Sequence, residues 1–146
     1  MAERHTVSAE ILDRAIRIAR AAHATQKDKA GEPFIAHVER VAAAVEGTGA
    51  KTIAYLHDVV EKGEGWSLER LRQAGFPEAI VSAVESLTRR PEETSDEFAH
   101  RAASDPLARP VKRADLEDNL RQAQRAGLDP GKYRRGLEIL GAVDGN

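Results

Sequence analysis

Apolar residues recur every three or four positions in one stretch of this chain after another, and no stretch alternates apolar and polar residues as a strand does. The first stretch, residues 8–24, shows the pattern clearly. Its apolar positions, with a histidine on the same face, are Ile11, Leu12, Ala15, Ile18, Ala19, Ala22 and His23. This spacing predicts an amphipathic helix with Ser8 as its N-cap. Because the pattern repeats along the chain, it restricts the fold to packed helices.

Residues that begin or end helices separate these stretches. Ser67 and Thr94 suit N-caps, and the spacing from Thr94 to Glu97 matches a capping box. Pro77 and Pro130 suit the first turn of a helix. We expect helices over about residues 8–24, 35–45, 50–61, 67–74, 77–87, 94–105, 107–126 and 129–141. The predicted class is all-α, a compact bundle of seven to eight helices with no sheet.

Composition narrows the function classes. At 146 residues the chain has the length of one domain, so we expect a single domain over residues 1–146 with its core at about 8–141 and a frayed tail at 142–146. The absence of cysteine excludes disulfides, thiolate zinc sites, iron–sulfur clusters and a cysteine nucleophile. The 22 Lys and Arg against 24 Asp and Glu give a net charge of −2, which does not favour a non-specific nucleic-acid binder.

The beginning of the chain is charged and lacks the apolar stretch of a secretory signal. No apolar run approaches the length of a membrane span. We therefore expect a soluble cytoplasmic protein with no membrane or nucleic-acid partner. The sequence does not give its oligomeric state.

Two ionisable residues, His57 and Asp58, stand next to each other inside an otherwise apolar run, residues 53–61. An unpaired charge in a buried helix is costly, so this dyad requires a partner or a metal ion. Glu61 follows one helical turn after His57 on the same face.

A second polar group lies far downstream. Asp115 and Asn119 are one helical turn apart and share a side with Val111. His37 opens the helix expected at 35–45. Two imidazoles and two carboxylates form a ligand set for Mn²⁺, Fe²⁺, Zn²⁺ or Mg²⁺. Each signal alone is weak, because a lone histidine on an apolar face is more often a hydrogen-bonded core residue than a ligand.

Three segments together resemble a known family. They are residues 22–37, with His23, Gln26, Gly31, Pro33 and His37; residues 56–61, Leu-His-Asp-Val-Val-Glu; and residues 111–119, with Asp115 and Asn119. The set resembles the HD-domain metal-dependent phosphohydrolases, and among them the RelA/SpoT-type hydrolase domain and the single-domain small alarmone hydrolases. The resemblance extends over about residues 9–140.

This resemblance implies a reaction and a set of roles. The family removes the 3′-pyrophosphate of ppGpp or pppGpp, the alarmones of the stringent response, giving GDP or GTP and pyrophosphate, with a metal-bound water as nucleophile. It implies one divalent cation, usually Mn²⁺, on His37, His57, Asp58 and Asp115. Glu61, with Asp58, falls on the catalytic positions. Substrate-binding candidates are Lys29, Asn119, Lys112 and Lys62.

The chain departs from the family at Lys62, where a second acidic residue is common, and at Phe34, where a tyrosine is frequent. Lys62 is either a helix C-terminal lysine favoured by the helix dipole or a cation facing the site. Glu64 is a candidate for the missing carboxylate. The alternatives to alarmone hydrolysis are an HD phosphohydrolase acting on another nucleotide or phosphate ester and a non-catalytic nucleotide-binding module.

Other polar residues have plainer interpretations. His23, on the apolar face of the first helix, suits a structural role or support of the metal ligands from behind. Asp118 is expected to be solvated, and Arg89 to flank a turn and need no function. Which basic residues face a pyrophosphate stays open among Lys27, Lys29, Lys112, Arg113, Arg101 and Arg109.

Overall fold

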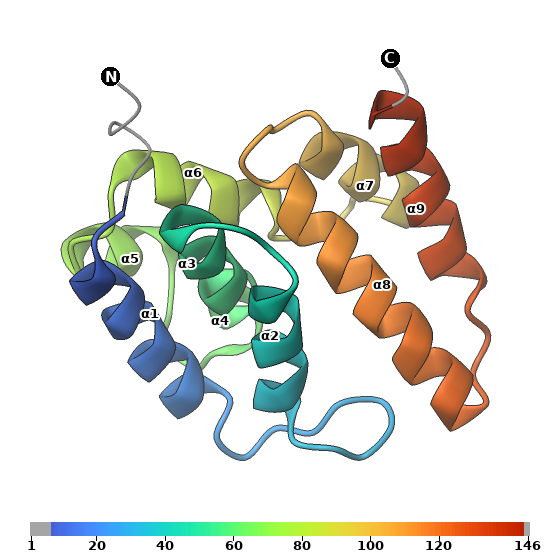
Figure 1. The fold of residues 1–146 in the computed structure, drawn as a ribbon, viewed down its shortest axis with the longest axis horizontal. Helices are drawn as coiled ribbons and strands as arrows, with labels where there is room; N and C mark the ends of the chain where they lie inside the picture. Colours follow the sequence, from blue (N-terminus) through green and yellow to red (C-terminus); the bar gives the residue numbers. More distant parts are fainter. Residues whose placement is uncertain (1–6, 145–146) are drawn as a thin grey trace.

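The structure, a computed structural model, describes residues 7–144 and places them in a bundle of helices (Figure 1). Within this range there is no strand, only an isolated antiparallel bridge between Lys27 and Pro33. The helical segments are α1 (Ala9–Ala22), α2 (Phe34–Ala43), α3 (Thr48–Leu56), α4 (Val59–Lys62), α5 (Leu68–Gln73), α6 (Glu78–Ser86), α7 (Ser95–Ala103), α8 (Arg109–Ala126) and α9 (Gly131–Asp144). The all-α prediction is confirmed. The last residues of the tail expected to fray, 145–146, lie outside the described range.

The described residues form nine helical segments, one more than the eight expected at most, because the helix expected at 50–61 is interrupted. α3 ends at Leu56, and the backbone of Asp58 leaves helical geometry at φ −109° and ψ 0°. α4 then adds a single turn, with the Lys62 amide bonded to the Asp58 carbonyl. The interruption falls on the two residues singled out as a dyad.

The predicted helix ends follow the expected chemistry. Ser8 and Ser67 accept hydrogen bonds from backbone amides three residues later, and Thr94 forms a complete capping box with Glu97. Between α1 and α2 the polar loop is tied by the Asp28 side chain, which accepts hydrogen bonds from the backbone amides of residues 30 and 32.

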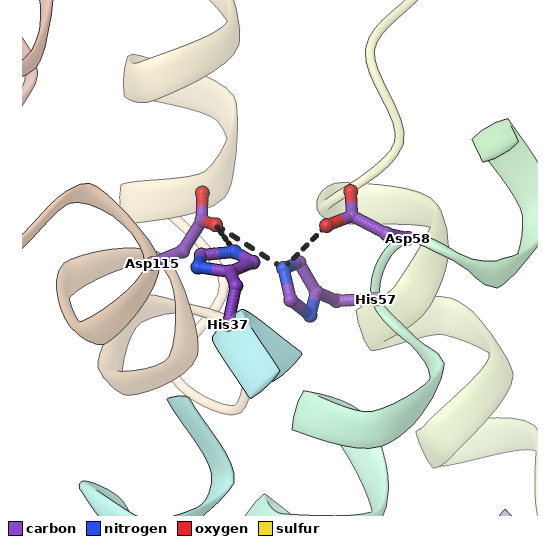
Figure 2. Close-up of side chains that lie close together, drawn as sticks. All are labelled: His37, His57, Asp58 and Asp115. Atoms are coloured by element: carbon purple, nitrogen blue, oxygen red, sulfur yellow. Dashed lines mark hydrogen bonds and ion pairs between the residues drawn. The ribbon is translucent and has the colours of Figure 1, made fainter. Parts of the chain in front are cut away.

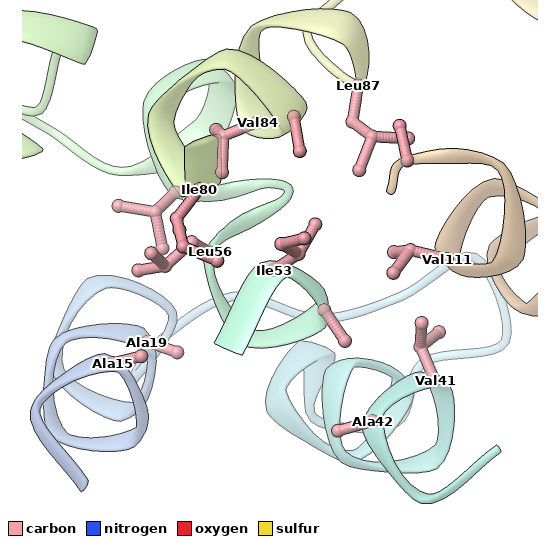
Figure 3. Close-up of a cluster of buried hydrophobic side chains, with 14 of the residues drawn as sticks. Ala15, Ala19, Val41, Ala42, Ile53, Leu56, Ile80, Val84, Leu87 and Val111 are labelled. Atoms are coloured by element: carbon pink, nitrogen blue, oxygen red, sulfur yellow. The ribbon is translucent and has the colours of Figure 1, made fainter. Parts of the chain in front are cut away.

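The main core lies among α1, α2, α3 and α6 and extends to α8 (Figure 3). Its fully buried members include Ala15, Ala19, Val41, Ile53, Leu56, Val84 and Val111. A smaller cluster joins α7, α8 and α9 through Ala99, Ala103, Leu116, Ile139 and Leu140. α8 contributes to both clusters and therefore holds the two halves of the bundle together.

α9 packs closely on α8 because Gly136 has no side chain. A Cβ atom at this position would lie 2.9 Å from the Leu116 methyl groups, closer than real contacts allow. Both residues also line the cavity described below. In the described part of the chain no helix is both long enough and apolar enough to span a membrane.

Candidate metal centre

The four predicted ligands come from three separate segments of the chain and converge at one point. His37 comes from α2, His57 and Asp58 from the junction of α3 and α4, and Asp115 from α8 (Figure 2). Each offers one donor atom, and these four atoms all lie within 4.8 Å of one another. Oδ1 of Asp115 is 3.0 Å from Nε2 of His37 and 3.2 Å from Nε2 of His57, which is 3.0 Å from Oδ2 of Asp58.

The main chain fixes the orientation of His57. The side chain is buried, and its Nδ1 lies 2.6 Å from the carbonyl oxygen of Ala54. A carbonyl only accepts hydrogen bonds, so Nδ1 carries a hydrogen and donates it. In the neutral imidazole the lone pair is then on Nε2, the nitrogen that faces the two carboxylates.

A side chain fixes His37 in the same way. Nδ1 of His37 lies 2.7 Å from Oδ2 of Asp118, and Nε2 faces Asp115. Asp118 is only 2% exposed, so the expectation that it is solvated was wrong. Arg40 donates from Nε to Oδ1 of Asp118 at 2.7 Å and from Nη2 to Oδ2 at 3.0 Å, and Gln122 donates to Oδ2 at 2.8 Å.

The charges of the centre depend on one another. Burial lowers the pKa of His57, but Asp58 and Asp115 outweigh it and hold that pKa well above its usual value. Burial raises the pKa of Asp115, but the hydrogen bonds with His37 and His57 outweigh it and hold that pKa well below its usual value. The site therefore favours ionised carboxylates and positive charge between them, as a divalent cation would supply.

This arrangement meets the requirements of a metal site. Two imidazole nitrogens and two carboxylate oxygens are presented together, and both imidazoles are held by hydrogen bonds at the opposite ring nitrogen. The cluster could bind a metal ion, and the donor types suit Mn²⁺, Fe²⁺, Zn²⁺ or Mg²⁺.

The four residues line a cavity of about 690 Å³, a size typical of small-molecule sites. Six of the lining residues are cationic: Lys27, Lys29, Lys62, Arg89, Lys112 and Lys132. Phe98, Leu116 and Tyr133 supply apolar surface. Lys112 is buried, with its Nζ 3.8 Å from the centre of the Phe98 ring and 3.9 Å from Oδ2 of Asp115. The cavity thus combines a candidate metal centre with positive charge and aromatic rings.

Lys29 connects the α1–α2 loop to α8. Its Nζ donates to Oδ1 of Asn119 and, at 3.2 Å, to Oε1 of Gln122. Asn119 in turn donates from Nδ2 to Oδ1 of Asp115 at 3.1 Å. Lys29 and Asn119, both predicted to bind substrate, therefore lie in the cavity and are also tied to the candidate ligands.

Glu61 and Lys62 are exposed residues of α4, and both line the cavity. Oε1 of Glu61 accepts a hydrogen bond of 3.3 Å from the backbone amide of Arg89. Nζ of Lys62 lies 5.5 Å from the centre of the Phe34 ring. Lys62 is the last residue of α4 and also lines the cavity, so both interpretations of this lysine fit its position. Glu64, the candidate for the missing carboxylate, is exposed and does not line the cavity.

His23 is buried behind this wall. Its Nδ1 lies 2.7 Å from Oε1 of Gln26, its ring centre is 4.9 Å from that of Phe34, and its Nε2 has no hydrogen-bond partner. Phe34 lies between His23 and His37, with its ring centre 5.3 Å from that of His37. The supporting role of His23 stays a prediction.

No protein-family model matches the chain. The chain is 34% identical over 128 residues to a probable guanosine-3′,5′-bis(diphosphate) 3′-pyrophosphohydrolase of Synechocystis sp.. The match covers 77% of this chain and 16% of that protein. It supports a relationship to the RelA/SpoT-type hydrolases.

Several residues of the site were missed by the sequence analysis. Arg89, Phe98 and Lys132 line the cavity, and Arg89 was expected to have no function. Of the basic residues left open, Lys27, Lys29 and Lys112 line the cavity, and Arg101, Arg109 and Arg113 do not. The signal available for Asp118 was its spacing: it lies three residues after Asp115 and four before Gln122, which places all three near one helical face.

Proposed function

We propose that this protein is a metal-dependent hydrolase of the HD type that removes the 3′-pyrophosphate of ppGpp and pppGpp. The observation that carries the proposal is the convergence of two histidine nitrogens and two carboxylate oxygens in the wall of a cationic cavity. The similarity to a probable ppGpp hydrolase supports the choice of substrate. The proposed unit is a single domain, with its core at about residues 8–141.

His37, His57, Asp58 and Asp115 are the proposed ligands of one divalent cation, for which Mn²⁺ is the first candidate. When bound, such a cation supplies Lewis acidity, which makes water more acidic and polarises a phosphoryl oxygen. The structure supports this assignment because both imidazoles are held at Nδ1 and present Nε2 to the carboxylates.

Glu61 is the proposed general base. It lines the cavity from α4, four residues after His57, and a carboxylate there can orient water and accept its proton. In the net reaction, the oxygen of water adds to the phosphorus attached to the ribose 3′-oxygen. The bond from that phosphorus to the 3′-oxygen breaks, and the 3′-oxygen takes a proton. The products are GDP or GTP and pyrophosphate.

The remaining lining residues have proposed roles in binding the nucleotide. Lys29, Lys62 and Lys112 place positive charge where a pyrophosphate needs it. Asn119 lies beside Lys29 and is proposed to face the sugar. The ammonium groups of Lys29 and Lys132 each lie 5.3 Å from the centre of the Tyr133 ring.

One observation favours a second candidate, a phosphohydrolase for another nucleotide or phosphate ester. Lys62 lines the cavity at a position where the resembling family commonly has a carboxylate. Exchange of a carboxylate for an ammonium group changes the local charge by two units and thus the phosphate pattern that fits best. The reaction chemistry at the metal would be unchanged.

Anion-exchange analysis of ppGpp incubated with the purified protein tests the proposal. With Mn²⁺ we expect GDP and pyrophosphate to appear together, and with EDTA neither. A cation bound without ppGpp turnover would overturn the alarmone assignment and direct the same assay to a panel of other phosphorylated nucleotides. If none of these nucleotides is hydrolysed, the remaining candidate is the non-catalytic nucleotide-binding module.

A further inference from the structure

The buried carboxylate of Asp118 contacts a proposed metal ligand from behind and takes no part in the proposed ligand set. It lies on α8 three residues after Asp115, and its side chain is only 3% exposed. Its Oδ2 is 2.7 Å from Nδ1 of His37, on the side of the imidazole opposite the cavity-facing Nε2.

Hydrogen bonding at Asp118 determines which tautomer His37 adopts. An ionised carboxylate only accepts hydrogen bonds, so Nδ1 of His37 must carry the hydrogen and Nε2 of the neutral ring must carry the lone pair. Gln122 also lies 2.9 Å from Nδ1, but its amide hydrogens have an acceptor in Oδ2 of Asp118 at 2.8 Å. Its Oε1 accepts from Lys29.

The charge of Asp118 is balanced from the other side. Arg40, one helical turn after His37 on α2, donates to both carboxylate oxygens at 2.7 and 3.0 Å. A two-point contact of this kind fixes the plane of the carboxylate as well as its charge. The carboxylate is thus held between a guanidinium group and the imidazole that it orients.

The other proposed histidine ligand provides an internal comparison. Nδ1 of His57 donates to the carbonyl oxygen of Ala54, a main-chain group that no substitution removes. Only the support of His37 depends on a side chain. The two imidazoles therefore have the same tautomer but are oriented by different groups. Only the group that orients His37 is a side chain that mutation can remove.

We propose that Asp118 is a positioning residue of the metal centre, which holds His37 in the Nδ1-protonated form with Nε2 free to bind a divalent cation. This inference rests on the proposed metal centre but does not depend on the identity of the substrate. Removal of such a support weakens metal binding by about 10- to 100-fold in metal sites of this type.

The test is a Co²⁺ titration of the full chain followed by visible absorption, which reports both affinity and ligand geometry. Asp118→Ala is compared with Val41→Ala, which removes a buried side chain from α2 but leaves both partners of the His37–Asp118 hydrogen bond in place. Arg121→Ala is a second control, because Arg121 contacts Asp118 only from the exposed surface, at 3.5 Å.

We expect Asp118→Ala to weaken Co²⁺ binding by about 10- to 100-fold and to change the cobalt spectrum, while both controls match the wild type. An affinity and spectrum equal to those of Val41→Ala would overturn the inference and leave Asp118 a purely structural residue.

If Asp118→Ala does not fold, Asp118→Asn replaces it. This variant keeps an acceptor oxygen but loses the charged pair with Arg40, so we expect weakening of about two- to tenfold. Unchanged affinity in Asp118→Asn would also count against the inference.

The titration separates this inference from the proposed function. Failure of the wild type to bind Co²⁺ would contradict the metal centre itself. Binding by the wild type without ppGpp turnover would contradict the alarmone assignment and leave the role of Asp118 to be decided by the variants.

Discussion

The ammonium group of Lys29 lies 3.2 Å from Oε1 of Gln122, 93 positions later in the chain, and so joins the α1–α2 loop to α8. Gln122 also donates to Asp118, which contacts His37. A residue that lines the cavity is thereby connected through two side chains to a proposed metal ligand. This relationship gives the first prediction.

Substitution Lys29→Ala should affect both the loop and substrate binding. Loss of the contacts to Asn119 and Gln122 frees the loop, so its backbone amides should exchange with solvent faster in hydrogen-exchange measurements. Loss of a cation in the cavity should raise the KM for ppGpp by about tenfold. Glu32→Gln, a change on the same loop away from the cavity, should do neither. Normal loop protection in Lys29→Ala would refute the connection.

Removal of Asp115 should abolish metal binding and turnover together. Its Oδ1 lies within 3.2 Å of both histidine Nε2 atoms, so Asp115→Ala removes the donor at the middle of the cluster. Mn²⁺ binding measured by calorimetry should be lost, and circular dichroism should confirm the fold. Glu117→Ala, an exposed position on α8, is the matched control. Full Mn²⁺ occupancy in Asp115→Ala would exclude this residue as a ligand.

Glu61→Gln should separate metal binding from catalysis. The side chain lines the cavity but is not one of the clustered donors, so Mn²⁺ affinity should stay as in the wild type. The kcat should fall by about 10²- to 10⁴-fold if the carboxylate accepts a proton from water. Glu64→Gln, in the following turn and outside the cavity, should retain the wild-type rate. An unchanged kcat in Glu61→Gln would remove Glu61 from the mechanism.

Lys62→Asp tests whether the cation on α4 binds substrate. Because its ammonium group is exposed and therefore screened, we expect the KM for ppGpp to rise by about three- to tenfold and the effect to shrink as salt is added. Arg17→Asp makes the same change of charge on the exposed surface of α1 and should leave the KM as it is. Equal KM values for Lys62→Asp and the wild type would show that Lys62 is a surface lysine.

The turn that carries Arg89 should become less stable in acid. Two hydrogen bonds from Arg101, at 2.7 and 2.8 Å, lower the pKa of Glu93 from 4.5 to about 2, although partial burial opposes this. A carboxyl group with a lowered folded-state pKa stabilises the fold above its unfolded pKa and loses that contribution as the pH falls.

The Tm of Glu93→Gln should therefore be lower than that of the wild type at pH 7, by the equivalent of about 1–2 kcal/mol. The difference should persist down to about pH 5 and disappear between pH 4.5 and about 2. Glu92→Gln, the exposed neighbour, should melt as the wild type does throughout. A difference that stays constant to pH 2 would exclude this ion pair as its cause.

Local patterns predicted the helices and singled out the four residues that converge in the candidate metal centre, because periodicity, caps and short motifs are properties of neighbouring residues. They did not predict the interruption at Asp58, since α4 keeps the helical spacing of α3 after a single residue outside helical geometry. Asp118, which stands among charged residues in the sequence, was expected to be solvated. Its partner His37 lies 81 positions away, and only the packing of α2 on α8 brings them together.

A titration of Mn²⁺ into the metal-stripped protein, with GDP and pyrophosphate release from ppGpp measured at each point, tests the central claim most directly. The account predicts that the rate rises with occupancy of the four-residue cluster and reaches its maximum at one Mn²⁺ per chain, and that EDTA abolishes it. Release of GDP that is independent of Mn²⁺, or no release at full occupancy, would contradict it.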